Sequence, residues 1–275
     1  MFDFNGKSVL VTGGGAGIGR AAAEAFAEAG ARVAIVEIDP ARAEDARKAL
    51  GSDAVIVTGD VTDKTVVADL AEQIESAFGG LDVLVNNVGD FLQLARPFDA
   101  LSNEEIDRLY LTNLGQVFSV TKAMIPLIKK NGPGGSIVSV SSIEGFRGIP
   151  NCVVYAACKA GLTGFTKSLA LELGPHGIRI NLIAPETTDT PQVPVLAMIA
   201  DEHKQDIARW TPLGRFGTPG DMASGILFLA SSHAAWITGT ALHIDGGALA
   251  AAGWYRDRKG MWTNVPVITG NGFNV

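Results

Sequence analysis

A tyrosine and a lysine, Tyr155 and Lys159, stand four residues apart in a stretch whose apolar residues recur at helical spacing from Val153 to Leu173. On a helix, residues at this spacing project from one face, so the two side chains can share a site. A free phenol titrates near pH ~10, and a neighbouring ammonium group lowers that pKa. The pair therefore predicts a general acid/base that exchanges a proton with a substrate.

A hydroxyl group on Ser142 precedes this pair and directly follows the apolar run Ser136 to Val140. We expect that run to be a strand, which places Ser142 at a carboxyl edge, where a hydrogen bond to a substrate oxygen would polarise it. Tyr-x-x-x-Lys alone is more often an exposed helix face. The position of Tyr155 after Ser142 is what favours catalysis.

A glycine-rich sequence, TGGGAGIG from Thr12 to Gly19, joins an apolar run to the helical stretch Arg20 to Ala29. Glycine permits a tight turn and lets a pyrophosphate approach the amides at a helix N-terminus. An ordinary strand-to-helix turn is the alternative, but so many glycines at one junction favour phosphate binding. The predicted cofactor contacts in this loop are Gly13, Gly15, Gly17, Ile18 and Gly19.

An acidic residue, Glu37, stands at the end of the second apolar run. A carboxylate there can accept hydrogen bonds from the adenosine ribose and repels a 2′-phosphate. Its neighbours Ile38 and Asp39 supply no compensating positive charge, so we expect NAD rather than NADP. The alternative is a solvated acid at a strand end.

Short apolar runs alternate with helical stretches along the chain, and several runs are apolar at consecutive positions. This pattern is typical of strands that helices cover on both faces. It predicts an α/β fold: a single domain over 1–250 with a doubly wound, mostly parallel, Rossmann-type sheet of about seven strands. The predicted strands are Ser8 to Thr12, Arg32 to Glu37, Ala54 to Thr58, Val83 to Asn86, Ser136 to Val140, Ile178 to Ile183 and Ala241 to Ile244; the predicted helices include Val66 to Phe78, Ile106 to Met124 and Val153 to Leu173.

Two regions break the alternation, Glu186 to Pro212 and the tail from Ala248 to Val275. We expect substrate specificity to lie there, with a substrate lid over about 186–215. The tail over 251–275 contains Trp254, Tyr255 and Trp262, which favour packing at the active site or at a subunit interface. A disordered tail is the alternative.

The 22 basic and 29 acidic residues give a net charge of −7, and no basic cluster could follow a phosphate backbone. We therefore expect no nucleic-acid partner. No segment has the ~18 to 20 consecutive apolar residues of a membrane span, the opening residues do not resemble a signal peptide, and Cys152 and Cys158 lack redox-pair spacing. We expect a cytoplasmic protein without a membrane anchor. The scattered histidines have no metal-ligand spacing, so we expect no metal.

Together these motifs resemble the classical short-chain dehydrogenase/reductase family over about the first 250 positions. The motifs are TGGGAGIG, Gly59-Asp60-Val61, Asn86-Asn87-Val88-Gly89, Asn113, Ser142, Tyr155-Ala-Ala-Cys-Lys159 and Asn181 through Pro185. The resemblance implies that Tyr155 is the general acid/base and that Ser142 orients the substrate oxygen. It also implies that Lys159 holds the nicotinamide ribose and that Asn113 holds a water in a proton relay.

The resemblance further implies contacts with each part of the cofactor. Asp60 and Val61 would contact adenine, Asn87 and Gly89 would pass near the adenine ribose, and Thr188 with Thr190 would reach the carboxamide. The remaining predicted cofactor contacts are Ile38, Tyr155, Lys159 and Pro185.

The sequence departs from the family pattern at two positions. Val88 stands where the Asn-Asn-Ala-Gly turn has alanine, a small enlargement. Glu186 stands where the family has glycine after the sixth strand, which removes conformational freedom and adds a carboxylate near the expected nicotinamide.

Family members are commonly tetramers, and Ala156, Ala160 and Gly164 form a stripe of small residues that would let another helix approach. Packing of this stripe against the protein's own sheet is the alternative. We expect a homo-oligomer.

The predicted substrate pocket is largely apolar. Its candidates are Phe91, Leu92, Leu94, Ile143 to Phe146, Val193 to Ile199 and Trp210. Arg96, Glu144 and Arg147 could anchor a polar group, but solvated charges at the rim are the more ordinary interpretation.

The sequence thus predicts an NAD-dependent oxidoreductase that transfers a hydride between nicotinamide and a secondary alcohol or ketone. A hydrophobic or cyclic substrate is expected, of hydroxysteroid, terpenoid or dihydrodiol type. One alternative is a 3-oxoacyl-thioester reductase, which Glu37 and the acidic balance disfavour. Another is a non-catalytic NAD(H)-binding sensor, which would not need Asn113, Ser142, Tyr155 and Lys159 together.

Overall fold

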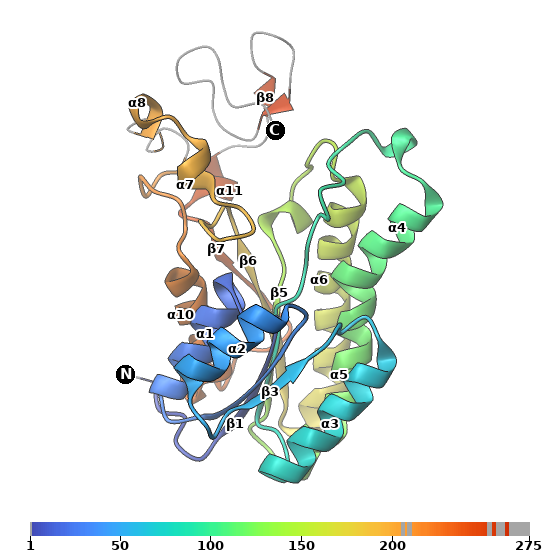
Figure 1. The fold of residues 1–275 in the computed structure, drawn as a ribbon, viewed down its shortest axis with the longest axis vertical. Helices are drawn as coiled ribbons and strands as arrows, with labels where there is room; N and C mark the ends of the chain where they lie inside the picture. The colour runs from blue at the N-terminus through green and yellow to red at the C-terminus, as the bar shows by residue number, and fades with distance from the viewer. Residues whose placement is uncertain (1, 205–206, 208–210, 252–254, 257–261, 264–275) are drawn as a thin grey trace.

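The computed structural model describes residues 2–204, 207, 211–251, 255–256 and 262–263. One sheet of seven parallel strands runs through the molecule in the order β3-β2-β1-β4-β5-β6-β7 (Figure 1). The strands are β1 (Ser8–Thr12), β2 (Arg32–Glu37), β3 (Val55–Thr58), β4 (Val83–Asn86), β5 (Ser136–Val140), β6 (Arg179–Pro185) and β7 (Ala241–Ile244). The predicted doubly wound α/β sheet is confirmed, with strand ends shifted by one or two residues at β3 and β6.

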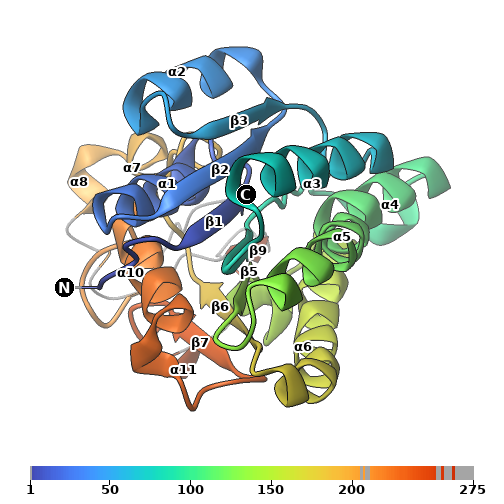
Figure 2. The ribbon, with the colours of Figure 1, turned by 90° about the horizontal axis from the view of Figure 1, so that it is seen from below.

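Helices cover both faces of this sheet, as Figure 2 shows from below. One face carries α1 (Gly17–Glu28) and α10 (Pro219–Ala230), and the other carries α3 (Lys64–Phe78), α5 (Gln116–Lys130) and α6 (Val153–Leu173). The remaining helices are α2 (Pro40–Leu50), α4 (Asn103–Tyr110), α7 (Val195–Met198), α8 (Asp201–Lys204) and α11 (Ala248–Ala251), with single 3-10 turns at Phe98–Ala100, Ile143–Gly145, Gly174–His176 and Ser232–Ala234.

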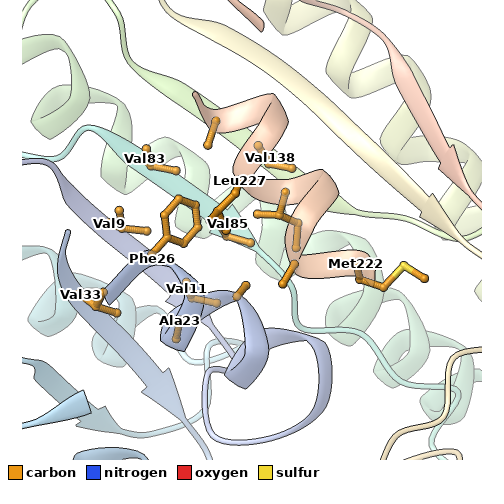
Figure 3. Close-up of a cluster of buried hydrophobic side chains, with 14 of the residues drawn as sticks. Val9, Val11, Ala23, Phe26, Val33, Val83, Val85, Val138, Met222 and Leu227 are labelled. Atoms are coloured by element: carbon orange, nitrogen blue, oxygen red, sulfur yellow. The ribbon is translucent and has the colours of Figure 1, made fainter. Parts of the chain in front are cut away.

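The central strands are apolar at consecutive positions because each face has its own hydrophobic core. On β1, Val9 and Val11 point toward α1 and α10, where Phe26 is fully buried among them (Figure 3). Leu10, between them, belongs to the core under α3 and α5. A strand with only one covered face would alternate apolar and polar residues instead.

The helical stretch predicted over Ile106 to Met124 is confirmed, but a π-helical turn at Leu111–Gly115, which the apolar spacing did not predict, lies between α4 and α5. The side chain of Asn113 lies in this turn, and its Nδ2 donates to the carbonyl of Leu109 four residues earlier, at 2.9 Å. A side-chain amide that takes a helix carbonyl competes with the backbone ladder. Single π-helical turns are frequently found at functional sites.

The two regions outside the alternation are partly described. The segment after β6 contains α7 and α8, and Val195, Ile199, Ile207 and Phe216 form a small buried cluster beneath it. In the tail, β8 (Tyr255–Arg256) pairs antiparallel with β9 (Trp262–Thr263). Trp210 and Trp254, and the side chains of Tyr255 and Trp262, lie outside the described residues. Within the described part of the chain, no helix is long and apolar enough to span a membrane.

The strand order reverses direction between β1 and β4. The loop that leaves β1 leads toward β2, whereas the loop that leaves β4 leads toward β5, so the two loops diverge at the carboxyl edge. A crevice at such a switch point is where open α/β sheets bind ligands.

Candidate active site

A cavity of about 710 Å³ lies at this carboxyl edge and is lined by residues from the loops after β1, β2, β3, β4, β5 and β6. Most of the residues predicted from the sequence lie on its wall. They are Gly13, Gly17, Ile18, Glu37, Ile38, Asp60, Val61, Asn87, Gly89, Ser142, Tyr155, Lys159, Pro185, Thr188 and Thr190. Gly15, Gly19 and Asn113 do not line the cavity themselves. They contact residues that do, namely Glu37, Gly13 and Asp90.

The glycine-rich loop leaves the N-terminus of α1 open toward the cavity. Gly13 has a φ of 64°, and a Cβ on Gly19 would lie 2.2 Å from the carbonyl oxygen of Gly13, so neither position accepts another residue without displacement. The N-cap residue Ala16 provides no side-chain hydrogen bond to the first turn of α1. These uncapped amides suit a phosphate.

Asn87 holds this loop against the end of β4. Its Nδ2 donates to the carbonyl of Thr12 at 2.9 Å, and its backbone N–H donates to the Thr12 hydroxyl at 3.0 Å. The predicted contact residues Asp60 and Val61 lie on the cavity wall after β3, where the Asp60 carboxylate accepts a hydrogen bond from the Thr62 N–H.

Glu37 is buried rather than solvated, which contradicts the strand-end alternative. Its carboxylate accepts hydrogen bonds from the backbone N–H groups of Gly15, at 3.0 Å, and Asp39, at 3.1 Å, and so braces the glycine-rich loop. Arg42 also lines the cavity, from the first turn of α2. Arg42 was not predicted as a cavity residue, because it lies five positions beyond Glu37 and only the fold brings it to the same wall.

Lys159 is buried, with 2% of its surface exposed, at the centre of the cavity wall. Its Nζ donates to the carbonyl of Val140, the last residue of β5, at 2.9 Å, and lies 5.5 Å from the centre of the Tyr155 ring. Burial lowers the pKa of Lys159 to about 8. The predicted proximity of Tyr155 and Lys159 is therefore present in the structure.

Tyr155 lies near Ser142, which precedes it on the loop that follows β5. Burial raises the pKa of the Tyr155 phenol well above its usual range, the Ser142 hydroxyl opposes this, and the charge of Glu144 adds to it. A neutral phenol beside a serine hydroxyl can donate a proton to a carbonyl oxygen.

Asn113 and Gly89 shape the wall beside Lys159. Asn113 Nδ2 donates to the Asp90 carbonyl at 2.7 Å, and its Oδ1 accepts from the Asp90 N–H at 2.9 Å, so this side chain anchors the loop after β4. A Cβ on Gly89 would lie 2.7 Å from Lys159 Nζ and 3.1 Å from Asn113 Oδ1. Glycine at position 89 therefore leaves the space in which these two groups meet.

Glu144 and Arg147 are not solvated rim charges, so that interpretation is wrong for both. Arg147 bonds to Glu144 and to Glu186, and all three side chains are less than a tenth exposed. Arg96 is half-buried and pairs with Glu105. Spacing could not reveal the first group, because Glu186 is remote in sequence from the other two.

Cys152 also lines the cavity, although no role was predicted for it. Burial and the nearby Glu144 carboxylate raise the pKa of its thiol to about 11. A thiol that stays protonated at neutral pH is a poor nucleophile, which agrees with assigning it no catalytic role.

The wall fits a nicotinamide dinucleotide along its whole length. The open helix N-terminus suits the pyrophosphate, Glu37 lies at the end where an adenosine ribose would bind, and the space kept by Gly89 adjoins the buried ammonium of Lys159. Thr188 and Thr190 line the opposite end, after β6.

The family model described as Enoyl-(Acyl carrier protein) reductase matches residues 13–248. An uncharacterized oxidoreductase of Schizosaccharomyces pombe is 39% identical over 248 residues, which cover 89% of this chain and 92% of that protein. The 3-oxoacyl-[acyl-carrier-protein] reductase FabG of Escherichia coli is 37% identical over 249 residues, which cover 89% of this chain and 98% of FabG.

A solved structure shares the fold. The 7α-hydroxysteroid dehydrogenase in complex with NADH and 7-oxoglycochenodeoxycholic acid aligns with a TM-score of 0.81 and 33% identity, covering 89% of this chain and 95% of that one. Family model, relatives and fold agree with the motifs on the cavity wall. The chain is an oxidoreductase of the classical short-chain dehydrogenase/reductase family, whose members use a nicotinamide cofactor.

Proposed function

We propose that this protein is an NAD-dependent oxidoreductase that interconverts a secondary alcohol and a ketone, with a hydrophobic or cyclic substrate. The observation that carries the proposal is the meeting of three groups on one cavity wall. The Tyr155 phenol, the nearby Ser142 hydroxyl and the buried Lys159 ammonium all line this cavity, and Gly89 leaves open the space beside the ammonium.

Each of these groups has a role in that reaction. When bound, the nicotinamide would supply or accept the hydride. Tyr155 donates a proton to the substrate oxygen in reduction and removes it in oxidation, while Ser142 donates a hydrogen bond to the same oxygen. Lys159 holds the nicotinamide ribose and favours the phenolate by its charge. Asn113, through Asp90, fixes the loop after β4 beside them and is the proposed anchor of a relay water.

An apolar substrate is supported by the cavity wall beyond Tyr155. Phe91, Leu92, Ile149 and Val193 line it from the loops after β4, β5 and β6. The 7α-hydroxysteroid dehydrogenase, whose structure aligns with this one, holds a steroid ketone. We propose that 186–215 is a lid over this part of the cavity, since Thr187 to Val193 contribute to its wall.

Reduction of 3-oxoacyl thioesters is a second candidate, favoured by the 37–40% identity to several FabG proteins. The acidic residue Glu37 argues against the NADPH that we expect such a reductase to prefer. The two candidates differ in cofactor and in substrate, so a direct assay separates them.

A homo-oligomer, expected to be a tetramer, is part of the proposal. Ala160 and Gly164 of the small-residue stripe are exposed on α6, and nothing lies within 4 Å of the Cβ position of Gly164, so the stripe does not pack against the protein's own sheet. The two free cysteines support a cytoplasmic location. We further propose that the tail over 251–275 packs at the active site or at a subunit interface.

Tyr155→Phe should lower turnover by about 10²- to 10⁴-fold, because it removes only the proton-transferring hydroxyl. NADH binding, measured by nucleotide fluorescence, should be retained. Tyr110→Phe is the matched control, since Tyr110 is exposed on α4. Turnover of Tyr155→Phe close to that of the unmodified protein would contradict the assignment.

Glu37→Gln should lower the ratio of kcat/KM with NAD to kcat/KM with NADP by about tenfold, equivalent to about 1.4 kcal/mol. The amide oxygen of glutamine can still accept the Gly15 N–H that braces the loop, so the variant removes the charge that repels a 2′-phosphate and one hydrogen bond, from the Asp39 N–H. Asp39→Asn removes a charge from the N-cap of α2 nearby and is the control. An equal effect of both variants would show that Glu37 does not select the cofactor.

Gly164→Leu should shift the protein to a smaller assembly in light scattering coupled to size exclusion, because its side chain would fill the space for an approaching helix. Ala49→Leu adds bulk to the exposed face of α2 and should leave the assembly unchanged. A Gly164→Leu protein with unaltered mass would place any interface elsewhere.

A panel of cyclic and steroidal alcohols, their ketones and a 3-oxoacyl thioester should be assayed with NAD(H) and NADP(H) at the reduced-nicotinamide absorbance band. We expect turnover with NAD and an apolar cyclic alcohol. Preferential reduction of the thioester with NADPH would establish the second candidate. Tight NADH binding without turnover across the panel would favour a sensor.

A further inference from the structure

Three buried charges join the loop that follows β5 to the loop that follows β6. The guanidinium of Arg147 donates to both carboxylate oxygens of Glu144, at 2.8 and 3.2 Å, and to Glu186 Oε2, at 2.7 Å. The side chains of Glu144, Arg147 and Glu186 are 9%, 7% and 6% exposed. We call these three residues the ion triad. One of its members, Glu186, stands where the family pattern has glycine.

The ion triad is tied to the backbone of both loops. On the β6 side, Glu186 Oε1 accepts hydrogen bonds from the N–H and the hydroxyl of Thr187, at 2.7 and 2.6 Å. On the β5 side, the backbone N–H of Glu144 donates to Ser142 Oγ at 3.1 Å, and Ser142 lies near the Tyr155 phenol, whose pKa it lowers. A series of contacts therefore runs from the loop after β6 to the proton-transferring phenol.

Arg147 is the member of the ion triad that contacts both others, so the positions of the two carboxylates depend on it. A guanidinium presents its donors in a fixed planar fork, so one arginine can hold two carboxylates at a defined separation. Removal of Arg147 takes away the guanidinium that both carboxylates share, so two like charges face each other in a buried place and the neighbouring backbone must move to separate them or to let water reach them. Glu144 and Glu186 both line the cavity, so such a movement would change its wall.

We propose that Arg147 is a positioning residue, which clamps Glu144 and Glu186 so that Ser142 and the loop after β6 are held in register beside Tyr155. This inference rests on the proposed function, in which Tyr155 and Ser142 act on one substrate oxygen. It also gives Glu186 a role. Its carboxylate is bound by Arg147 and so fixes the start of the loop after β6, where a glycine would leave the backbone more conformational freedom.

The ion triad also sets the charge around Tyr155. The titratable groups that raise the pKa of this phenol are Glu144 after β5, Cys152 before α6 and Asp90 after β4. The Lys159 ammonium on α6 lies 5.5 Å from the centre of the Tyr155 ring. Glu144 raises the pKa of Tyr155, and Arg147 lies against Glu144 and offsets its charge. Loss of Glu144 should therefore lower the Tyr155 pKa, whereas loss of Arg147 should raise it.

The experiment compares Glu144→Gln, Arg147→Met and Arg147→Lys, with Glu75→Gln as control because Glu75 forms an exposed ion pair with Lys130 on the other side of the molecule. The Tyr155 phenol is followed by NMR of tyrosine labelled with ¹³C at Cζ in the NAD complex, where the cofactor charge brings its titration toward neutral pH. The resonance is assigned by its absence in Tyr155→Phe. This readout needs no substrate.

We expect the Tyr155 titration to move to lower pH in Glu144→Gln and to higher pH in Arg147→Met, by a few tenths of a unit or more each, and to stay unchanged in Glu75→Gln. In Arg147→Lys the Tyr155 titration should resemble that of the unmodified protein, because the positive charge is kept. An ammonium lacks the planar fork of donors, however, so it should not hold Glu144 and Glu186 together as arginine does. With a substrate from the panel, kcat should fall about tenfold or more in both Arg147 variants, while the dissociation constant for NADH changes by less than about twofold.

Titrations that move in the same direction in Glu144→Gln and Arg147→Met, or that do not move, would overturn the proposal. So would full kcat in Arg147→Lys. If Arg147→Met does not fold, Glu186→Gln replaces it, because it keeps a polar partner for Arg147. It should lower kcat without a change in NADH affinity, and an unchanged kcat would overturn the clamp. Opposite titration shifts in a protein without turnover on any substrate would instead contradict the proposed function.

Discussion

The buried ammonium of Lys159 is the constraint that the active site is built around. An ion of this size loses several kcal/mol of hydration when it leaves water, so it needs polar or aromatic partners nearby. The carbonyl of Val140 accepts one of its hydrogen bonds, and the Tyr155 ring lies beside it. The remaining penalty is visible in its pKa, which burial lowers to about 8. Gly89 is required at the same place, because a side chain there would occupy the position of the ammonium.

The protein buries charge by the same means at its opposite edge. Arg179, at the start of β6, donates to the carbonyls of Leu229, Ala230 and Ser231, where α10 ends. Carbonyls at a helix C-terminus lack intrahelical partners and carry partial negative charge, so they suit a guanidinium. Arg179 thereby holds α10 against the sheet and is enclosed by carbonyl groups. Lys159, by contrast, also lines the cavity.

The sheet and most of the cavity wall could be predicted from the sequence, because each strand and each loop at its carboxyl end has a recognisable pattern over a few neighbouring residues. Consecutive apolar residues on β1 reflect two covered faces, and the glycines before α1 reflect a close approach of backbone to backbone. The π-helical turn could not be predicted in this way. In this turn the Asn113 side chain donates to the carbonyls of Leu109 and Asp90, and the apolar periodicity continues through it.

The ion triad shows the same limit more strongly. Arg147 and Glu144 are three residues apart and look like an exposed pair, and their burial follows from Glu186, which reaches them from another strand. Likewise, the bracing of the glycine-rich loop by Glu37 needs the parallel pairing of β1 with β2, which sets Gly15 beside it. Contacts of this kind follow from topology rather than from any sequence window.

The charges around Tyr155 bear on substrate choice in a specific way. Asp90, Glu144 and Glu186 lie on the cavity wall, and Arg147 supplies one positive charge beside the two glutamates. Under the proposed function we therefore expect a substrate with a carboxylate close to its reacting carbon to bind less well. The 3-oxo group of an oxoacyl thioester is a neutral ketone, as is the carbonyl of a cyclic ketone, so charge on this wall does not distinguish the two proposed substrate classes. Their difference is the phosphorylated carrier, which would remain at the mouth of the cavity. Discrimination therefore belongs to the rim, where Arg108 is exposed, and to the segment after β6, rather than to the groups that perform the chemistry.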